Sequence, residues 1–185
     1  IAILAALTVS GMSYAQQASA RNRSLASRSA IKSGLETYKE KFGEYPTPKS
    51  PLETGSFGAG KTMVTGGAAM LYQALSGDGS DAIDLGQNSN SKPSDGKLDT
   101  DELPNKAVGE LPKGMVFRSS NGTVYLVVDG FGHPFQYQKG DASNTINQTS
   151  YDLWSYGTAP ETSIPSSLPS LSERQTKSGA WIKNW

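Results

Sequence analysis

The first forty-odd residues carry the longest hydrophobic pattern of the chain. Residues 1–20 contain no charged side chain, and charges begin at Arg21. Apolar residues then recur at helical spacing, at Ile31, Leu35, Tyr38 and Phe42. Intervals of four, three and four place these side chains on one face of a helix. The pattern predicts an N-terminal helical segment, residues 1–45, in which one continuous helix ends near Phe42, with Gly43 at its C-cap and Pro46 just beyond.

Such a helix is too long for the rest of the chain to cover. Forty residues span about 60 Å at 1.5 Å per residue, whereas a compact domain made from residues 46–185 is about 35–40 Å across. We therefore expect the charge-free end to protrude and to be buried by a lipid bilayer or by other copies of the helix. We also expect the apolar segment to begin before Ile1, because a membrane span takes about 20 apolar residues.

A cleaved secretory signal is the competing interpretation of this apolar start. No small-x-small cleavage pattern separates the apolar run from a polar mature start, and the helical pattern simply continues. The continuity favours a helix that stays part of the protein.

Beyond the helix the pattern changes twice. Residues 67–75 predict a short amphipathic helix that ends at Ser76-Gly77. Residues 115–128 predict a β-hairpin whose turn contains Asn121-Gly122, and two further strands are expected at 135–138 and 151–157. The tail should pack back onto the sheet through Trp181, Ile182 and Trp185, since these residues would otherwise be exposed. The predicted fold class is α+β, with a long protruding N-terminal α-helix packed on a small antiparallel β-sheet domain with long loops.

Composition narrows the possible functions. The chain of 185 residues is 36% hydrophobic and 18% charged, with 20 Gly, 10 Pro and no Cys. The absence of cysteine excludes disulfides, thiolate metal sites and a cysteine nucleophile. A net charge of zero makes no case for nucleic acid as a partner. Residues 20–45 are nevertheless mainly basic and residues 78–102 mainly acidic, so the two could pair between neighbouring copies or could both be solvated surfaces.

Residues 55–62 match the phosphate-binding pattern G-x-x-x-x-G-K-T. That chemistry needs a loop between a buried strand and a helix. The preceding residues, 47–54, are polar and contain two prolines, so they do not form the required strand. A phosphate-binding enzyme is therefore a secondary hypothesis, and we expect a glycine-rich loop here.

Residues 95–102 resemble the second half of an EF-hand calcium loop. With Gly96 at the sharp turn, the ligands would be Asp95, Asp99 and Glu102. The first and third ligand positions would fall on Ser91 and Pro93, so half of the motif is missing and Asp84, Asn88 or Asn90 would have to supply oxygens. Calcium binding and a solvated acidic loop both remain open. His133, the one histidine of the sequence, is expected to be a turn residue rather than a catalytic base or a zinc ligand.

Several segments resemble type IV pilins and the pseudopilins of type II secretion. Residues 1–6 resemble the end of the apolar run of their N-terminal helix, although the Phe-Thr-Leu-Ile-Glu start of the family is not in this sequence. Residues 38–47 match a Tyr-x-x-x-x-Gly-x-Tyr-Pro-Thr passage at the point where that helix leaves the domain core. The other similar segments are 71–77, 129–137 (with Gly130 and His133 in place of proline and asparagine), 151–157 and 180–185. The major pseudopilin is the member that the chain resembles most.

The resemblance implies a structural subunit, not an enzyme, that polymerises through bundled N-terminal helices. It also implies a precursor in the inner membrane, processing and methylation by a prepilin peptidase, an assembly platform as partner, and a final place in a periplasmic or extracellular filament. The family's calcium site is not carried over, because no Asp follows residue 157. The residues expected at the assembly interface are Ile1, Ile3, Leu4, Leu7, Val9, Met12 and Tyr14.

Two questions stay open at this level. A secretion pseudopilus and a surface pilus are not distinguished by these residues. A membrane-anchored, calcium-dependent binding module centred on residues 84–102 is the alternative function.

Overall fold

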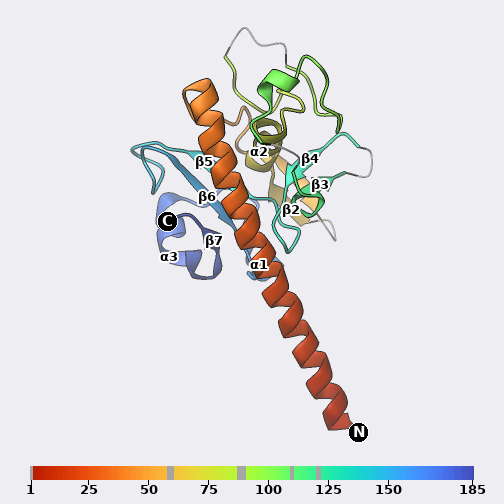
Figure 1. Ribbon diagram of the computed structural model, residues 1–185. Coiled ribbons are helices and arrows are strands. Elements are labelled where there is room, and N and C mark those ends of the chain that lie inside the picture. The colour runs from red at the N-terminus through yellow and green to blue at the C-terminus, as the bar shows by residue number, and fades with distance from the viewer. Residues whose placement is uncertain (1, 58–60, 87–90, 109–110, 120–121) are drawn as a thin grey trace.

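The computed structural model describes residues 2–57, 61–86, 91–108, 111–119 and 122–185. It is an α+β protein whose first element, α1 (Ala2–Phe42), is one unbroken helix that runs along the body and extends far beyond it (Figure 1). Gly43 ends α1 in the left-handed conformation (φ 85°), and its N–H donates to the carbonyl of Lys39 at 2.7 Å. The predicted class, the protruding helix and its end are confirmed.

The second half of α1 belongs to the core of the body. Ile31, Leu35 and Tyr38 are buried there, as their spacing predicted. Phe42, on the same face, is 42% exposed, and the centroid of its ring lies 4.4 Å from that of Tyr38. Eleven residues make slightly more than three helical turns, so Phe42 has nearly the same angular position as Ile31. It is exposed because the apolar core ends before the last turn of α1.

Helix α2 (Gly66–Ser76) lies between α1 and the strands. Its side chains are buried on nearly all sides, including those of Met70, Leu71 and Leu75. A Cβ added to Gly34 of α1 would lie 2.4 Å from Cδ2 of Leu75, so the glycine allows the two helices to approach closely. Gly77 ends α2 with φ 81° and donates its N–H to Gln73 at 2.8 Å, which confirms the predicted end.

The described strands form small antiparallel sheets, as the fold class predicted. They are β1 (Thr54–Phe57) with β2 (Lys61–Val64), β3 (Val116–Arg118) with β4 (Tyr125–Val127), and β5 (Gln136–Lys139), β6 (Tyr151–Ser155) and β7 (Ile182–Lys183) in one sheet of order β5-β6-β7. The predicted hairpin of residues 115–128 is confirmed, with shorter strands and a wider turn in which Ser119 N–H donates to the carbonyl of Val124. Asn121 lies outside the described residues.

The C-terminal region contains a third helix. Helix α3 (Leu171–Lys177) begins at a capping box in which Ser170 and Glu173 bond to each other's backbone N–H. The tail packs as predicted, because Ile182 pairs with Ser155 and the rings of Trp181 and Trp185 lie 6.2 and 5.8 Å from that of Trp154. The short 3-10 helices are η1 (Leu103–Asn105), η2 (Lys113–Met115), η3 (Glu161–Ser163) and η4 (Ser178–Ala180).

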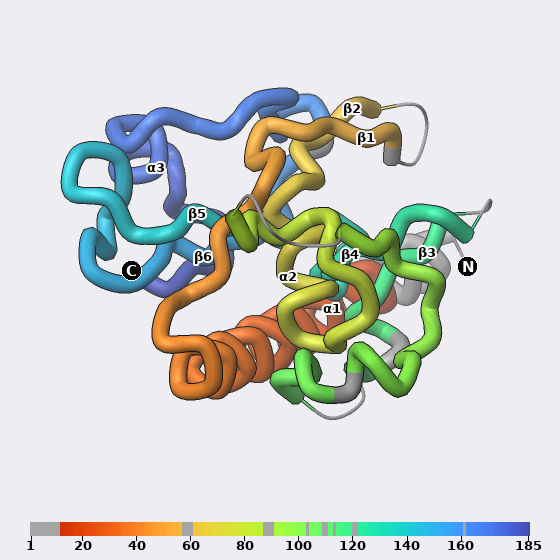
Figure 2. Tube along the Cα trace, turned by 90° about the horizontal axis from the view of Figure 1, so that it is seen from above, coloured from red at the N-terminus to blue at the C-terminus, as the bar shows by residue number. Residues whose placement is uncertain are grey.

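A buried arginine attaches α3 to the three-stranded sheet. Arg174 is fully buried and donates to the side chain of Gln138 and to the carbonyl of Asn144. Its guanidinium lies 3.8 Å from the buried carboxylate of Asp152 and over the ring of Trp154. Figure 2 shows α3 close to β5 and β6, and the β1–β2 hairpin at the edge of the body away from the C-terminal turns of α1.

Candidate functional site

The free end of α1 is the first candidate site. Every residue from 12 to 19 is exposed, and Met12 and Tyr14 are 67% and 76% exposed. Figure 1 shows this end of the helix far from the strands and from α2. Residues 2–19 alone make about 27 Å of helix. Of the predicted interface, Met12 and Tyr14 are therefore accessible to a partner.

The other predicted interface residues lie nearer the start of the chain. Ile3, Leu4, Leu7 and Val9 are on the described backbone of α1, in a part where side chains are not described, and Ile1 is outside the described residues. No helix in the described part of the chain combines the length and the hydropathy that crossing a bilayer requires.

The helix meets the body at a contact that the hydrophobic pattern missed. Small residues extend the packed stripe of α1 toward the N-terminus, since Ala20, Ser24 and Ser27 are all buried. The hydroxyl of Ser24 donates to the carbonyl of Ala20 at 2.8 Å and accepts the N–H of Gly130 at 2.9 Å. A Cβ on Gly130 would lie 2.1 Å from the carbonyl oxygen of Ala20. The absence of a side chain at Gly130 therefore allows this close approach of the turn to α1.

The turn that carries Gly130 is built around a buried carboxylate. Asp129 Oδ1 accepts the N–H groups of Phe131 and His133 at 2.8 and 2.9 Å, and its Oδ2 accepts the hydroxyl of Ser155. His133 is a turn residue, as predicted, with Nδ1 3.8 Å from Asp129 Oδ2. The turn is thereby held rigidly against α1.

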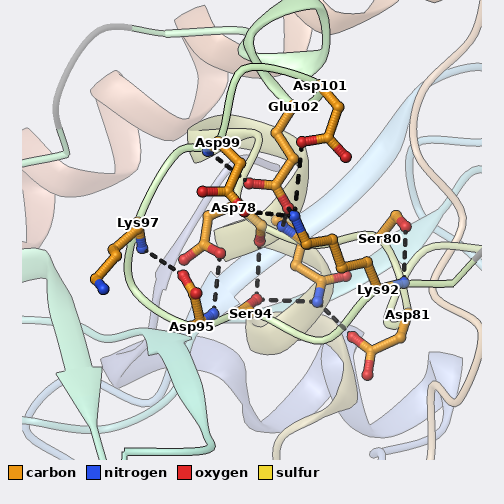
Figure 3. A network of polar contacts seen from close by, with 12 residues as sticks. Asp78, Ser80, Asp81, Lys92, Ser94, Asp95, Lys97, Asp99, Asp101 and Glu102 are labelled. Carbon is orange, nitrogen blue, oxygen red and sulfur yellow. Dashed lines mark hydrogen bonds and ion pairs between the residues drawn. The ribbon is translucent and has the colours of Figure 1, made fainter.

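The second candidate site is residues 78–102, which we call the acidic loop (Figure 3). Its first carboxylate, Asp78, is buried and accepts the N–H groups of Asp95 and Gly96 at 3.0 and 2.8 Å and the hydroxyl of Tyr72 at 2.6 Å. Burial, and next the hydrogen bond to Asp78, raise the pKa of Tyr72 far above its usual value. Gly96 has φ 84°, so the sharp turn predicted at this glycine is confirmed.

The side chain of Lys92 lies beside the carboxylates at the C-terminal end of the acidic loop. Lys92 Nζ lies 2.6 Å from Asp99 Oδ2, 3.3 Å from Glu102 Oε1 and 3.7 Å from Asp101 Oδ1. Figure 3 shows its side chain reaching between these carboxylates. The sequence interpretation missed this role of Lys92, although a lysine seven residues before an Asp-x-Asp-Glu run was a visible signal.

The three predicted calcium ligands do not all lie at one place but contact different groups. Asp99 and Glu102 come together beside Lys92, whereas Asp95 Oδ1 accepts the N–H of Lys97 at 2.8 Å. Across the described residues, no three or more His, Asp or Glu side chains form a group that could hold a metal ion. The arrangement favours the interpretation as a loop with internal ion pairs.

The phosphate-binding pattern falls on a hairpin. Residues 58–60 are outside the described part, but Ser56 pairs with Thr62 and Phe57 with Lys61 in β1 and β2. The prediction of a glycine-rich loop over the whole stretch was wrong for these strand residues. A phosphate cradle needs its Lys-Thr pair at the start of a helix, where N–H groups point at the ligand. Here the pair lies in a strand, so the geometry does not support a nucleotide site.

Comparison with protein-family models, with curated proteins and with solved structures finds no match to this chain. The class that the structure itself defines is an α+β protein with a long N-terminal helix and small antiparallel sheets.

Proposed function

We propose that this chain is a structural subunit of an extracytoplasmic filament of the pilin or pseudopilin type. It polymerises through its N-terminal helix, with the body on the outside of the filament. In this proposal the protein is not an enzyme and acts by assembly with copies of itself.

One observation carries the proposal, namely the free end of α1. A helix with exposed residues 12–19, preceded by an uncharged apolar run, leaves a surface that water does not favour. Burial of apolar surface contributes about 25 cal/mol per Å². Identical helices side by side would bury this surface, and repetition of the same contact generates a filament when the contact is head-to-tail and does not close.

The resemblance to pilins agrees with where the similar segments lie. Residues 38–47 contain the end of α1 and the exit toward the body, where Tyr45 is buried and Tyr137 donates its hydroxyl to the carbonyl of Pro46 at 2.8 Å. Residues 129–137 hold the turn against α1, and residues 151–157 include the central strand β6. Three of the similar segments thus lie near the place where the helix meets the body.

The further expectations come from the resemblance and belong to the same proposal. They are a precursor in the inner membrane, processing and methylation by a prepilin peptidase, export by an assembly platform, and a mature filament in the periplasm or outside the cell. The alternative, a membrane-anchored calcium-dependent module, has less support because Lys92 sits among the acidic loop's carboxylates. A phosphate-binding enzyme has none, because Lys61 and Thr62 lie in β2.

Electron microscopy of the full chain tests the proposal. The protein is purified in a nonionic detergent, the detergent is removed, and negatively stained samples are searched for fibres. We expect fibres for the unmodified chain, and none for Leu7→Asp, which places a charge in the expected interface. Leu52→Asp is the matched control, because Leu52 is 67% exposed on the body, and it should still form fibres.

Two results would contradict the proposal. The first is a monodisperse monomer in water without detergent, measured by light scattering. The second is fibre formation by Leu7→Asp equal to that of the unmodified chain.

A further inference from the structure

The acidic loop is closed by an ion-pair cluster around one ammonium group. Lys92 Nζ is within 4 Å of three carboxylates, with distances of 2.6, 3.3 and 3.7 Å to Asp99, Glu102 and Asp101. A lysine ammonium has three donor hydrogens and no acceptor. It therefore has a donor for each of the three carboxylates that surround it.

The most buried of these carboxylates joins both ends of the acidic loop. Glu102 is 5% exposed. Its Oε1 accepts the N–H of Gly79 at 3.1 Å, and its Oε2 accepts the N–H of Asp99 at 3.0 Å. A buried carboxylate needs an opposite charge as well as hydrogen bonds. Lys92 supplies that charge at the oxygen that also holds Gly79.

The backbone of Lys92 is held in place, so its side chain starts from a defined position. The carbonyl of Lys92 accepts the N–H groups of Ser80 and Asp81 at 2.8 and 3.2 Å. Its own N–H donates to the hydroxyl of Ser80 at 3.2 Å. These bonds tie the segment that carries the lysine to the start of the acidic loop. The hydrogen-bonded backbone of Lys92 thus positions its ammonium group beside the carboxylates.

The ammonium group of Lys92 stays positively charged throughout the physiological pH range. The hydrogen bond to Asp99 raises the pKa of Lys92 above its usual value, against the opposing effect of desolvation. The same contact lowers the pKa of Asp99. Both partners are therefore ionised across the neutral range, and the cation cannot be removed by a chelator.

We propose that the ammonium of Lys92 is the built-in cation of the acidic loop, so that the loop closes without a divalent metal ion. Hard divalent cations are bound by several carboxylate oxygens around one position. Here Lys92 holds the corresponding position beside Asp99 and Glu102. Removal of the ammonium leaves the carboxylates of Asp99, Asp101 and Glu102 without their shared counter-ion, which should destabilise the closed loop. This inference does not depend on the proposed filament function.

The test compares the full chain with Lys92→Met, which keeps the length of the side chain and removes its charge. Thermal unfolding is followed by circular dichroism in a nonionic detergent, with 1 mM EDTA and with CaCl₂ added up to about 10 mM, ten times a weak extracellular calcium Kd. We expect the unmodified chain to unfold at the same temperature in both conditions. Lys92→Met should unfold at a lower temperature than the unmodified chain in both conditions, because the buried carboxylate of Glu102 then lacks its opposite charge.

Lys97→Met is the matched control, since it removes one positive charge from an exposed position of the same loop. It should unfold close to the temperature of the unmodified chain in both conditions. The inference is overturned if EDTA or Ca²⁺ shifts the unfolding of the unmodified chain. It is also overturned if Lys92→Met unfolds at the same temperature as the unmodified chain.

Discussion

The two halves of α1 are made of different residues and meet different surroundings. The C-terminal half carries Ile31, Leu35 and Tyr38, which are buried among α2 and the strands. The N-terminal half carries residues 12–19, all exposed, and an uncharged apolar run before them. One half is a part of the body's core, and the other is uncharged and is exposed over residues 12–19, where its side chains are described.

In the proposed filament, the two halves of the helix have separate roles, packing in the body and contact with other copies. Most of the stability of a helix in a protein comes from packing of its apolar face. The body provides that packing only from Ala20 onward. Substitutions in the two halves should therefore separate, with effects on unfolding from the C-terminal half and effects on assembly from the N-terminal half.

The largest effect on unfolding is expected from Leu35→Ala. Leu35 is fully buried, and removing such a leucine side chain costs about 2–5 kcal/mol through lost burial and the remaining cavity. Thermal or urea unfolding in a nonionic detergent measures the change. Leu25→Ala is the control on the same helix, because Leu25 is 36% exposed and should lose far less. Equal losses at both positions would contradict the assignment of Leu35 to the buried face of α1 and of Leu25 to its exposed face.

Gly130→Ala should break the contact where the two halves meet. The new Cβ would lie 2.1 Å from the carbonyl oxygen of Ala20, so the turn or the helix must move. Overpacking of this kind costs about 1–3 kcal/mol. Gly114→Ala is the control, since a Cβ there meets nothing within 4 Å. A loss at Gly114 as large as at Gly130 would show that the close approach is not the cause.

Ser24→Ala removes the hydroxyl that links α1 to the same turn. It leaves the N–H of Gly130 without the partner at 2.9 Å, and a hydrogen bond lost in this way costs about 1 kcal/mol. Ser33→Ala, at an exposed position of α1, should be close to neutral in the same unfolding experiment. The prediction fails if the two alanine variants unfold alike.

The smallest effect on unfolding is expected from Met12→Ala combined with Tyr14→Ala. Both side chains are more than half exposed, so the free energy of unfolding should change by no more than about 0.5 kcal/mol. In the proposed filament the same pair lies at the interface between helices. Sedimentation after detergent removal should therefore show less polymer than for the unmodified chain. A large loss of stability without a loss of polymer would contradict the role proposed for the N-terminal half of α1.

Local signals in the sequence predicted much of the fold. Helical spacing located the buried residues Ile31, Leu35 and Tyr38, and Gly43 and Gly77 marked the helix ends. These predictions succeeded because each depends on residues a few positions apart. The capping box at Ser170 and Glu173 was an equally local signal for α3 that our interpretation did not use.

The junction and the acidic loop could not be predicted in the same way. The contact of Ser24 with Gly130 joins residues 106 positions apart, and serine and glycine give no hydrophobic signal. The EF-hand interpretation assigned Asp99 and Glu102 to a metal because it considered acidic residues alone. It did not consider that a lysine of the same loop, Lys92, reaches both carboxylates.

The close contact of Gly34 with Leu75 has a geometric consequence for the far end of α1. Because α1 is continuous from Ala2 to Phe42, any twist of the helix about its own axis is prevented at this contact. The packing of α1 on the body therefore fixes the orientation of the projecting part of the helix about its own axis. One extra residue inserted between Tyr14 and Ala20 would rotate the helix N-terminal to the insertion by about 100° relative to the body. It would also move the N-terminus about 1.5 Å further from the body, whose own structure would not change.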